Sequence, residues 1–117
     1  MDKNHKIIDF SHLYSIAGDD EIFKKELIGI FLKQIPVFIA NMNQFLANNE
    51  IENFAREAHT AKSSVLIFGM VNTGQLLKNI QNLAEDKKMS EIAPILKLVE
   101  MEFNQAVTEL LSTLEEG

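Results

Sequence analysis

The sequence predicts an all-α fold, namely an up-down antiparallel four-helix bundle with a short extra N-terminal helix. Apolar residues recur at helical spacing along most of the chain, and the segments that connect them are short. The 117 residues include only five Gly and two Pro, and no β-rich stretch is bounded by closely spaced turn signals. We therefore expect one domain, residues 1–117, which is long enough to bury a core.

The first two helices are bounded by glycine and aspartate. A short helix is expected from Phe10 to Ile16, and Gly18 ends it. Asp19 or Asp20 then caps a long second helix that reaches about Ala47. The apolar residues of this helix include Phe23, Leu27, Ile30, Phe31, Phe38, Met42 and Phe45.

Pro36 falls inside the second helix and should bend it, because proline removes one backbone hydrogen bond. A break into two shorter helices is the alternative. Asn48 and Asn49 make the turn into a third helix, which runs from about Ile51 to Gly69.

The last two helices follow the same rules. The fourth should run from Val71 or Asn72 to Lys87, with Gly74 weakening its start. Ser90 caps the fifth, where Pro94 is close enough to the start to be tolerated. The inward residues of the fourth helix are Leu76, Leu77, Ile80, Leu83 and Ala84. The apolar stripe of the fifth is Ile95, Leu98, Val99, Met101, Phe103, Val107, Leu110 and Leu114.

The third helix carries the feature that bears on function, a histidine at the edge of its apolar face. That face consists of Ile51, Phe54, Ala55, Ala58, Ala61, Val65 and Gly69. His59 lies about 100° from its centre and is therefore a boundary residue. Arg56 lies about one turn before His59, and Lys62 and Ser63 lie one turn after it.

This arrangement suits phosphoryl chemistry. A histidine exposed to water is largely neutral at pH 7, and the neutral imidazole is nucleophilic. Small neighbours let a bulky electrophile approach, while the cations Arg56 and Lys62 favour a group that arrives with negative charge. The geometry alone leaves open that His59 is a surface histidine with no role.

Composition excludes several classes of function. The chain has no Cys, which excludes a disulfide scaffold, a thiolate metal site and a cysteine nucleophile. The formal net charge of −6 argues against a nucleic-acid partner. No apolar run approaches the ~20 residues that span a bilayer, and the polar N-terminus is unlike a signal peptide. We therefore expect a cytoplasmic protein with no membrane association.

We also expect no bound cofactor. The five Gly are scattered, so there is no glycine-rich nucleotide loop, and no clustered carboxylates suggest a Mg²⁺ site. His5 and His12 are seven residues apart and have no third ligand in evidence, which disfavours a metal site there. The chain should therefore not use ATP.

The segment from Ala58 to Met70, AHTAKSSVLIFGM, resembles the signature A-H-x-L-K-G-S-x-x-x-x-G-A of histidine-containing phosphotransfer (HPt) domains. The approach Gly18-Asp19-Asp20-Glu21, the stretch from Phe31 to Pro36, the Asn-rich turn and the spacing of the last two helices are also similar to that family. The resemblance thus covers nearly the whole chain.

The resemblance implies that His59 accepts a phosphoryl group from an aspartyl phosphate on one receiver domain and donates it to an aspartate on another. Lys62 matches the lysine that neighbours the phosphohistidine. Gln81 falls where some members carry a glutamine that hydrogen-bonds the active histidine. The partners would be receiver domains of response regulators and hybrid histidine kinases, with Mg²⁺ on the receiver. The carrier itself is expected to be a monomer.

Three positions depart from the signature. Ser63 replaces a Gly that leaves room for the incoming group, and its hydroxyl could either crowd that space or bond a phosphoryl oxygen. Ala61 replaces a Leu, and Met70 replaces an Ala. On the helical wheel Leu66 lies near His59, while Ile67 and Met70 lie toward the outside. We expect these three to form a partner patch with Lys62 and Arg56 on its rim.

Other readings stay open. The phosphoacceptor helix pair of a histidine kinase would need an acidic residue after the histidine and a Pro soon after, where this chain has Thr60 and Ser64. A helical-bundle adaptor that binds receiver domains or kinases without being phosphorylated is a second alternative, and a haem- or metal-binding bundle is a third. Met1 and the complete set of helices favour a free-standing protein over a piece of a hybrid kinase.

Overall fold

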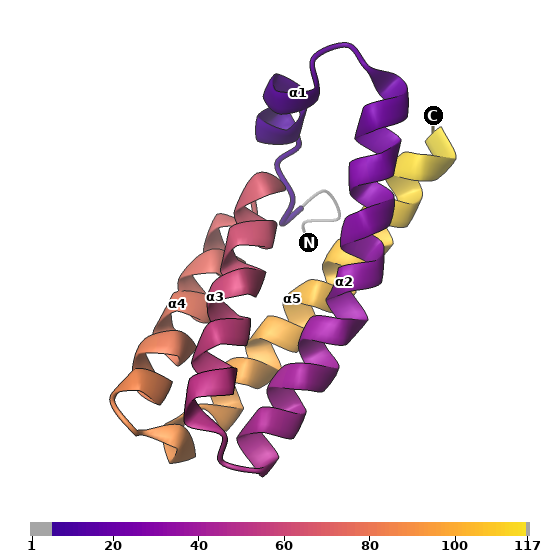
Figure 1. The fold of residues 1–117 in the computed structure, drawn as a ribbon. Coiled ribbons are helices and arrows are strands. Elements are labelled where there is room, and N and C mark those ends of the chain that lie inside the picture. Colours follow the sequence, from indigo (N-terminus) through magenta and orange to yellow (C-terminus); the bar gives the residue numbers. More distant parts are fainter. Residues whose placement is uncertain (1–5, 117) are drawn as a thin grey trace.

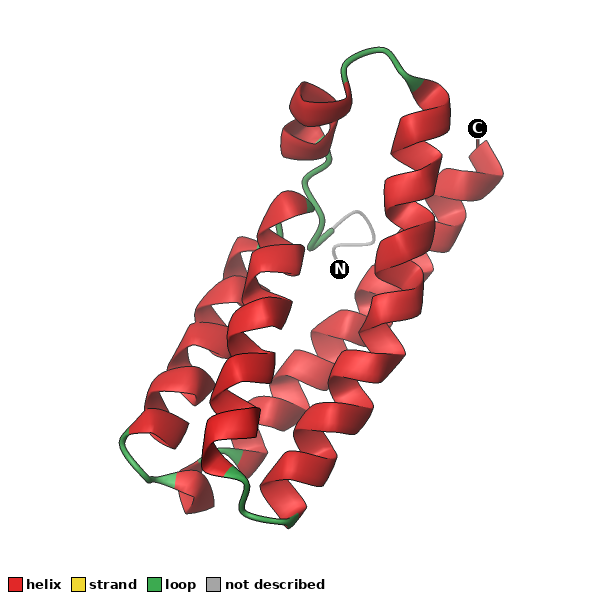
Figure 2. Cartoon of the chain, in the orientation of Figure 1, coloured by secondary structure: helices red, strands yellow, loops and turns green. Residues whose placement is uncertain are grey.

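The computed structural model describes residues 6–116, and every regular element in that range is helical. Figures 1 and 2 show the long helices of this range side by side and the short helix at one end of the bundle. The elements are α1 (Ser11–Ala17), α2 (Glu21–Ala47), α3 (Ile51–Ile67), α4 (Val71–Glu85), the 3₁₀ turn η1 (Met89–Glu91) and α5 (Ala93–Glu116). The predicted fold class is confirmed.

The helices close into a ring because each long helix packs on the next and α5 returns to α2. Aromatic side chains fill the space between them. Phe31 of α2 stacks on Phe68 with ring centroids 4.4 Å apart, and Phe38 stacks on Phe103 of α5 at 6.3 Å. All four rings are buried, and this apolar burial is the main source of stability for the bundle.

The start of α2 agrees with the prediction. The Asp20 carboxylate accepts a hydrogen bond from the backbone N–H of Phe23 at 2.9 Å and so caps the helix. The helix continues through Pro36, so the alternative of two shorter helices is wrong. Phe23 and Ile30, which were named among the apolar residues of this helix, are 37% and 53% exposed, because they lie on the flank of the stripe that faces the core.

The junction of α3 and α4 depends on the absence of a side chain at Gly74. This glycine is buried, and a Cβ there would lie 2.9 Å from Cδ2 of Leu66. Gly74 therefore permits the two helices to approach closely. From the sequence, this glycine was expected only to weaken the start of α4, and its packing role was missed. On the other side of α4, the Glu102 carboxylate of α5 accepts hydrogen bonds from Asn72 and Thr73 and fixes the first turn of α4.

The segment before α1 is fastened to the bundle by a carboxylate. Glu109 of α5 accepts hydrogen bonds from the backbone N–H groups of Ile7 and Ile8 at 3.0 and 3.1 Å. The next residue, Asp9, donates its N–H to the carbonyl of Phe68 at 3.1 Å. Gly69 has a φ of 66°, and a Cβ there would lie 2.4 Å from the Asp9 carbonyl oxygen. This segment therefore packs directly on the turn between α3 and α4.

The entry to α5 differs from the prediction. Ser90 lies in η1, and α5 itself begins at Ala93, with Pro94 as its second residue, where the missing N–H costs nothing. Leu98 and Met101 were expected in the buried stripe but are 47% and 62% exposed. Both fall on the flank of a stripe that is centred on Val99, Phe103, Ala106 and Leu110.

Candidate functional site

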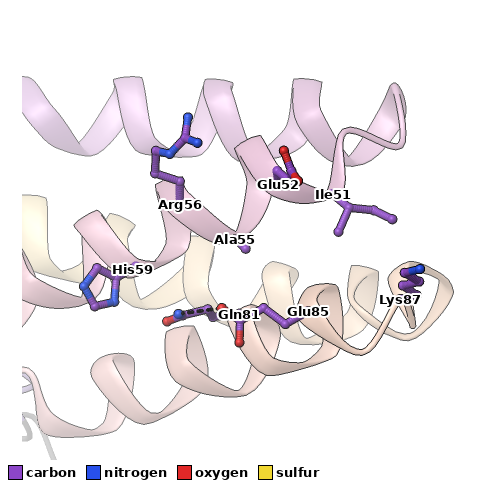
Figure 3. Close-up of a pocket in the computed structure, with 8 residues that line it drawn as sticks. All are labelled: Ile51, Glu52, Ala55, Arg56, His59, Gln81, Glu85 and Lys87. Carbon is purple, nitrogen blue, oxygen red and sulfur yellow. Dashed lines mark hydrogen bonds between the residues drawn. The ribbon is translucent and has the colours of Figure 1, made fainter.

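His59 is exposed on α3 and borders a groove between α3 and α4 with a volume of about 710 Å³. Figure 3 shows the imidazole at one end of this groove, facing the side chains of α4. The residues that line the groove are Ile51, Glu52, Ala55, Arg56, His59, Gln81, Glu85 and Lys87. His59 therefore lies at the edge of the buried face of α3, which is the boundary position that the sequence predicts.

The helix places His59 there because its buried face is narrow and built of small residues. Phe54, Ala55, Ala58, Ala61 and Val65 are buried against the bundle. Alanine at three of these five positions keeps α3 close to its neighbours and leaves little bulk beside the imidazole. Another molecule can therefore reach the ring from solvent.

Two cations flank the histidine along the helix. Lys62 lies one turn after His59 and is half-buried, while Arg56 lies about one turn before it, is exposed and lines the groove. The carboxylates of Glu52 and Glu85 line the same groove, so the two cations are the groups near His59 that would attract an anionic group.

The Ser63 hydroxyl is occupied by the backbone of its own helix. Its Oγ donates a hydrogen bond to the carbonyl of His59 at 3.3 Å. In this rotamer the proton is not available to an incoming phosphoryl oxygen, and the hydroxyl lies back against the helix. The sequence left open whether this hydroxyl crowds the incoming group or bonds a phosphoryl oxygen, and such a bond would require the hydroxyl to leave the His59 carbonyl.

Gln81 of α4 lies in the same groove as His59, as its helical position indicated. Its amide Nε2 donates to Oε2 of Glu85 at 3.0 Å, whereas no hydrogen bond joins it to the imidazole within residues 6–116. Sequence reasoning missed Glu52, Glu85 and Lys87 as groove residues. The signal for Glu85 was present, because residues four apart lie one above the other on a helix.

The expected partner patch is exposed only in part. Leu66 and Ile67 are 42% and 37% exposed, whereas Met70 is fully buried, so the expectation that Met70 faces outward is wrong. The reason is the turn after α3. The chain reverses at Gly69, and Met70 becomes the residue that precedes α4, with its side chain in the core. Val71, which the sequence reading did not single out, is 72% exposed instead.

Residues 6–116 contain no group of three or more His, Cys, Asp and Glu placed to hold a metal ion. His12 is exposed on α1, and His5 lies outside the described residues. In the same range, no helix is both long and apolar enough to cross a membrane.

Comparisons with known proteins point to one family. Residues 26–117 match the Hpt domain family. A curated relative is the phosphorelay intermediate protein YPD1 of Candida albicans, which is 25% identical over 73 residues, or 62% of this chain. The aligned part spans 40% of the length of that relative. No solved structure gave a significant match. Because the family match covers most of the chain and includes the histidine helix, the chain belongs to the Hpt domain family.

Proposed function

We propose that this chain is a phosphoryl carrier in a multistep two-component phosphorelay, with His59 as the group that is phosphorylated. The observation that carries the proposal is the exposed imidazole on α3, between two cations, in a chain that belongs to the Hpt domain family. The name of the Candida albicans relative, a phosphorelay intermediate protein, supports the same activity. His59 would receive the phosphoryl group from the aspartate of one receiver domain and pass it to another.

The chemistry is an in-line displacement at phosphorus. The lone pair of His59 Nε2 attacks the aspartyl phosphate, the P–O bond to the aspartate breaks, and the carboxylate leaves with the bonding electrons. Nδ1 keeps its proton, so the ring carries positive charge as the new N–P bond forms. Nε2 is the nucleophile because Nδ1 lies nearer the backbone. Lys62 supplies positive charge beside the transferred group, and positioning supplies most of the rate.

The remaining catalytic groups belong to the partner. We propose that the receiver domain brings Mg²⁺ and the acidic pocket, and that this chain binds no cofactor and has no ATP site of its own. It is then a carrier and not an enzyme when alone. The partners are receiver domains of response regulators and hybrid histidine kinases. The exposed Leu66 and Ile67 contact them, with Arg56 on the rim. We place this carrier in the cytoplasm as a monomer without a nucleic-acid partner.

A transfer assay with radiolabelled receivers tests the proposal. Receiver domains charged with labelled acetyl phosphate should transfer label to the wild-type chain, and the label should be acid-labile and base-stable. His59→Gln should abolish the label, while His12→Gln, which changes an exposed histidine on α1, should leave it unchanged. Label that persists on His59→Gln would refute His59 as the acceptor.

The same experiment separates a carrier from an adaptor. If receivers form a complex with the wild-type chain but no label moves in either direction, the adaptor reading is correct. Leu66→Ser combined with Ile67→Ser should weaken the complex about tenfold or more, because apolar contacts at the centre of an interface carry much of its binding energy. Asn104→Ser, on the exposed side of α5, is the matched control and should bind as wild type.

A further inference from the structure

The groove beside His59 contains a hydrogen-bonded pair on α4 that phosphoryl transfer as described above does not use. Gln81 is half-buried and lines the groove, and its amide Nε2 donates to Glu85 Oε2 at 3.0 Å. Figure 3 shows the Gln81 amide between the imidazole of His59 and the carboxylate of Glu85. The three side chains therefore follow one another along the groove.

A glutamine amide has two different ends, and a carboxylate can bond only one of them. The Glu85 carboxylate accepts hydrogen bonds but cannot donate them, so it can bind only the NH₂ end of the Gln81 amide. The carbonyl oxygen Oε1 is then the end that is left for another partner. An imidazole in its neutral form has one N–H and one lone pair, so Oε1 can bond the ring only through that N–H.

We propose that Glu85 is a positioning residue that acts through Gln81 on His59. By holding the amide at its nitrogen, Glu85 presents Oε1 to the ring N–H, which fixes the tautomer whose other nitrogen carries the free lone pair. This inference rests on the proposed function, because it concerns how that nucleophile is prepared. The Oε1–imidazole bond forms in a fraction of the free chain, which biases the tautomer of the free imidazole, and it tightens when the partner is bound.

The arrangement also serves the transfer step. As Nε2 bonds to phosphorus, the ring keeps its proton at Nδ1 and gains positive charge, and an acceptor at that N–H stabilises the charge. A carboxylate behind the amide polarises the amide and strengthens its oxygen as an acceptor. Glu85 would thus orient Gln81, and Gln81 would set the tautomer of His59. Hydrogen-bonded groups orient catalytic histidines in the same way in enzymes.

The first test reads the tautomer directly and needs no phosphorylation. In protein labelled with ¹⁵N-histidine, the ring nitrogen shifts and couplings at alkaline pH report which nitrogen of His59 is protonated. Wild type should show an excess of one tautomer at His59, and Glu85→Gln should move it toward the ratio of the exposed His12 in the same spectra. Asp86→Asn removes a carboxylate from the next residue of the chain and should change nothing.

The second test is a double-mutant cycle on the transfer rate. Glu85→Gln should slow phosphoryl transfer from a charged receiver about fivefold, the value of one ordinary hydrogen bond. In the Gln81→Ala background the same change should have no further effect, because Glu85 would have lost the residue through which it acts. Unfolding midpoints of the variants should agree, since the pair lies at the groove surface.

Two results would overturn the inference. One is an unchanged His59 tautomer in Glu85→Gln. The other is an equal effect of Glu85→Gln with and without Gln81, which would mean that its charge acts alone. If the wild-type chain takes label from no receiver, the proposed function fails, but the tautomer measurement still decides the role of Glu85.

Discussion

Glu109 provides the sharpest test of how the N-terminal segment is held. Its carboxylate accepts from the backbone N–H of Ile7 at 3.0 Å and of Ile8 at 3.1 Å, and the side chain of Gln105 donates to it at 2.9 Å. Glu109→Gln keeps the size of the side chain but replaces one acceptor oxygen with a donor NH₂. One of the two backbone N–H groups would then face another donor.

The expected cost follows from that count. A hydrogen bond to a charged group contributes about 1.5–3 kcal/mol, so losing one lowers the free energy of unfolding by about that amount. For a domain of this length the melting temperature should fall by about 6–12 °C. Circular dichroism gives the melting temperature, and hydrogen exchange should show that the amides of Ile7 and Ile8 lose protection before the amides of the core.

Glu100→Gln is the matched control. Glu100 accepts a single hydrogen bond from Asn43, at an exposed position between α2 and α5, so its loss should cost no more than about 0.5 kcal/mol. Equal melting temperatures for the two variants, or unchanged exchange at Ile7 and Ile8 in Glu109→Gln, would refute the assignment of Glu109 as the anchor of this segment.

Three further predictions follow from the same region. Gly69→Ala should lower the free energy of unfolding by about 2 kcal/mol or more in urea titrations, because a Cβ would meet the Asp9 backbone and φ is positive. Met70→Ala should lower the free energy of unfolding by about 2–5 kcal/mol, because Met70 is buried in the core. Val71→Ala should change it by no more than about 0.5 kcal/mol, because Val71 is exposed. Hydrogen bonds from Ser11, first from its side chain and then from its backbone, lower the pKa of Asp9. The folded pKa is below the unfolded one, so this stabilisation is present above the unfolded pKa and is lost as the pH falls through the folded pKa. Asp9→Asn should therefore flatten the acid limb of stability against pH.

The long helices and the position of His59 were predictable because both depend on local rules. Asp20 caps α2, the predicted end of that helix at Ala47 is where it ends, and the spacing of Phe54, Ala58, Ala61 and Val65 fixes which way His59 faces. These are periodicity and capping effects within a single helix. A reader of the sequence could therefore locate the candidate site without coordinates.

The errors came where one element meets another. Met70 was expected outside because the wheel of α3 was extended past Gly69, whereas the chain turns there and Met70 belongs to the start of α4. Met101 was assigned to the core from hydrophobicity, yet the width of the buried stripe on α5 depends on how closely its neighbours approach. The bond between Gln81 and Glu85 also required coordinates, because Lys78 and Glu85 both lie one turn from Gln81 and the sequence does not say which of them it bonds.

The close contact between Gly74 and Leu66 bears on how the exposed surface beside His59 can change in evolution. Leu66 packs on this glycine, so the position of the exposed Leu66 side chain depends on a buried residue that a binding partner does not contact. Any larger residue at that position would push the leucine outward and alter the relief of the surface beside His59. A substitution at buried Gly74 would thus change the preference among the proposed receiver partners without replacing any solvent-facing residue.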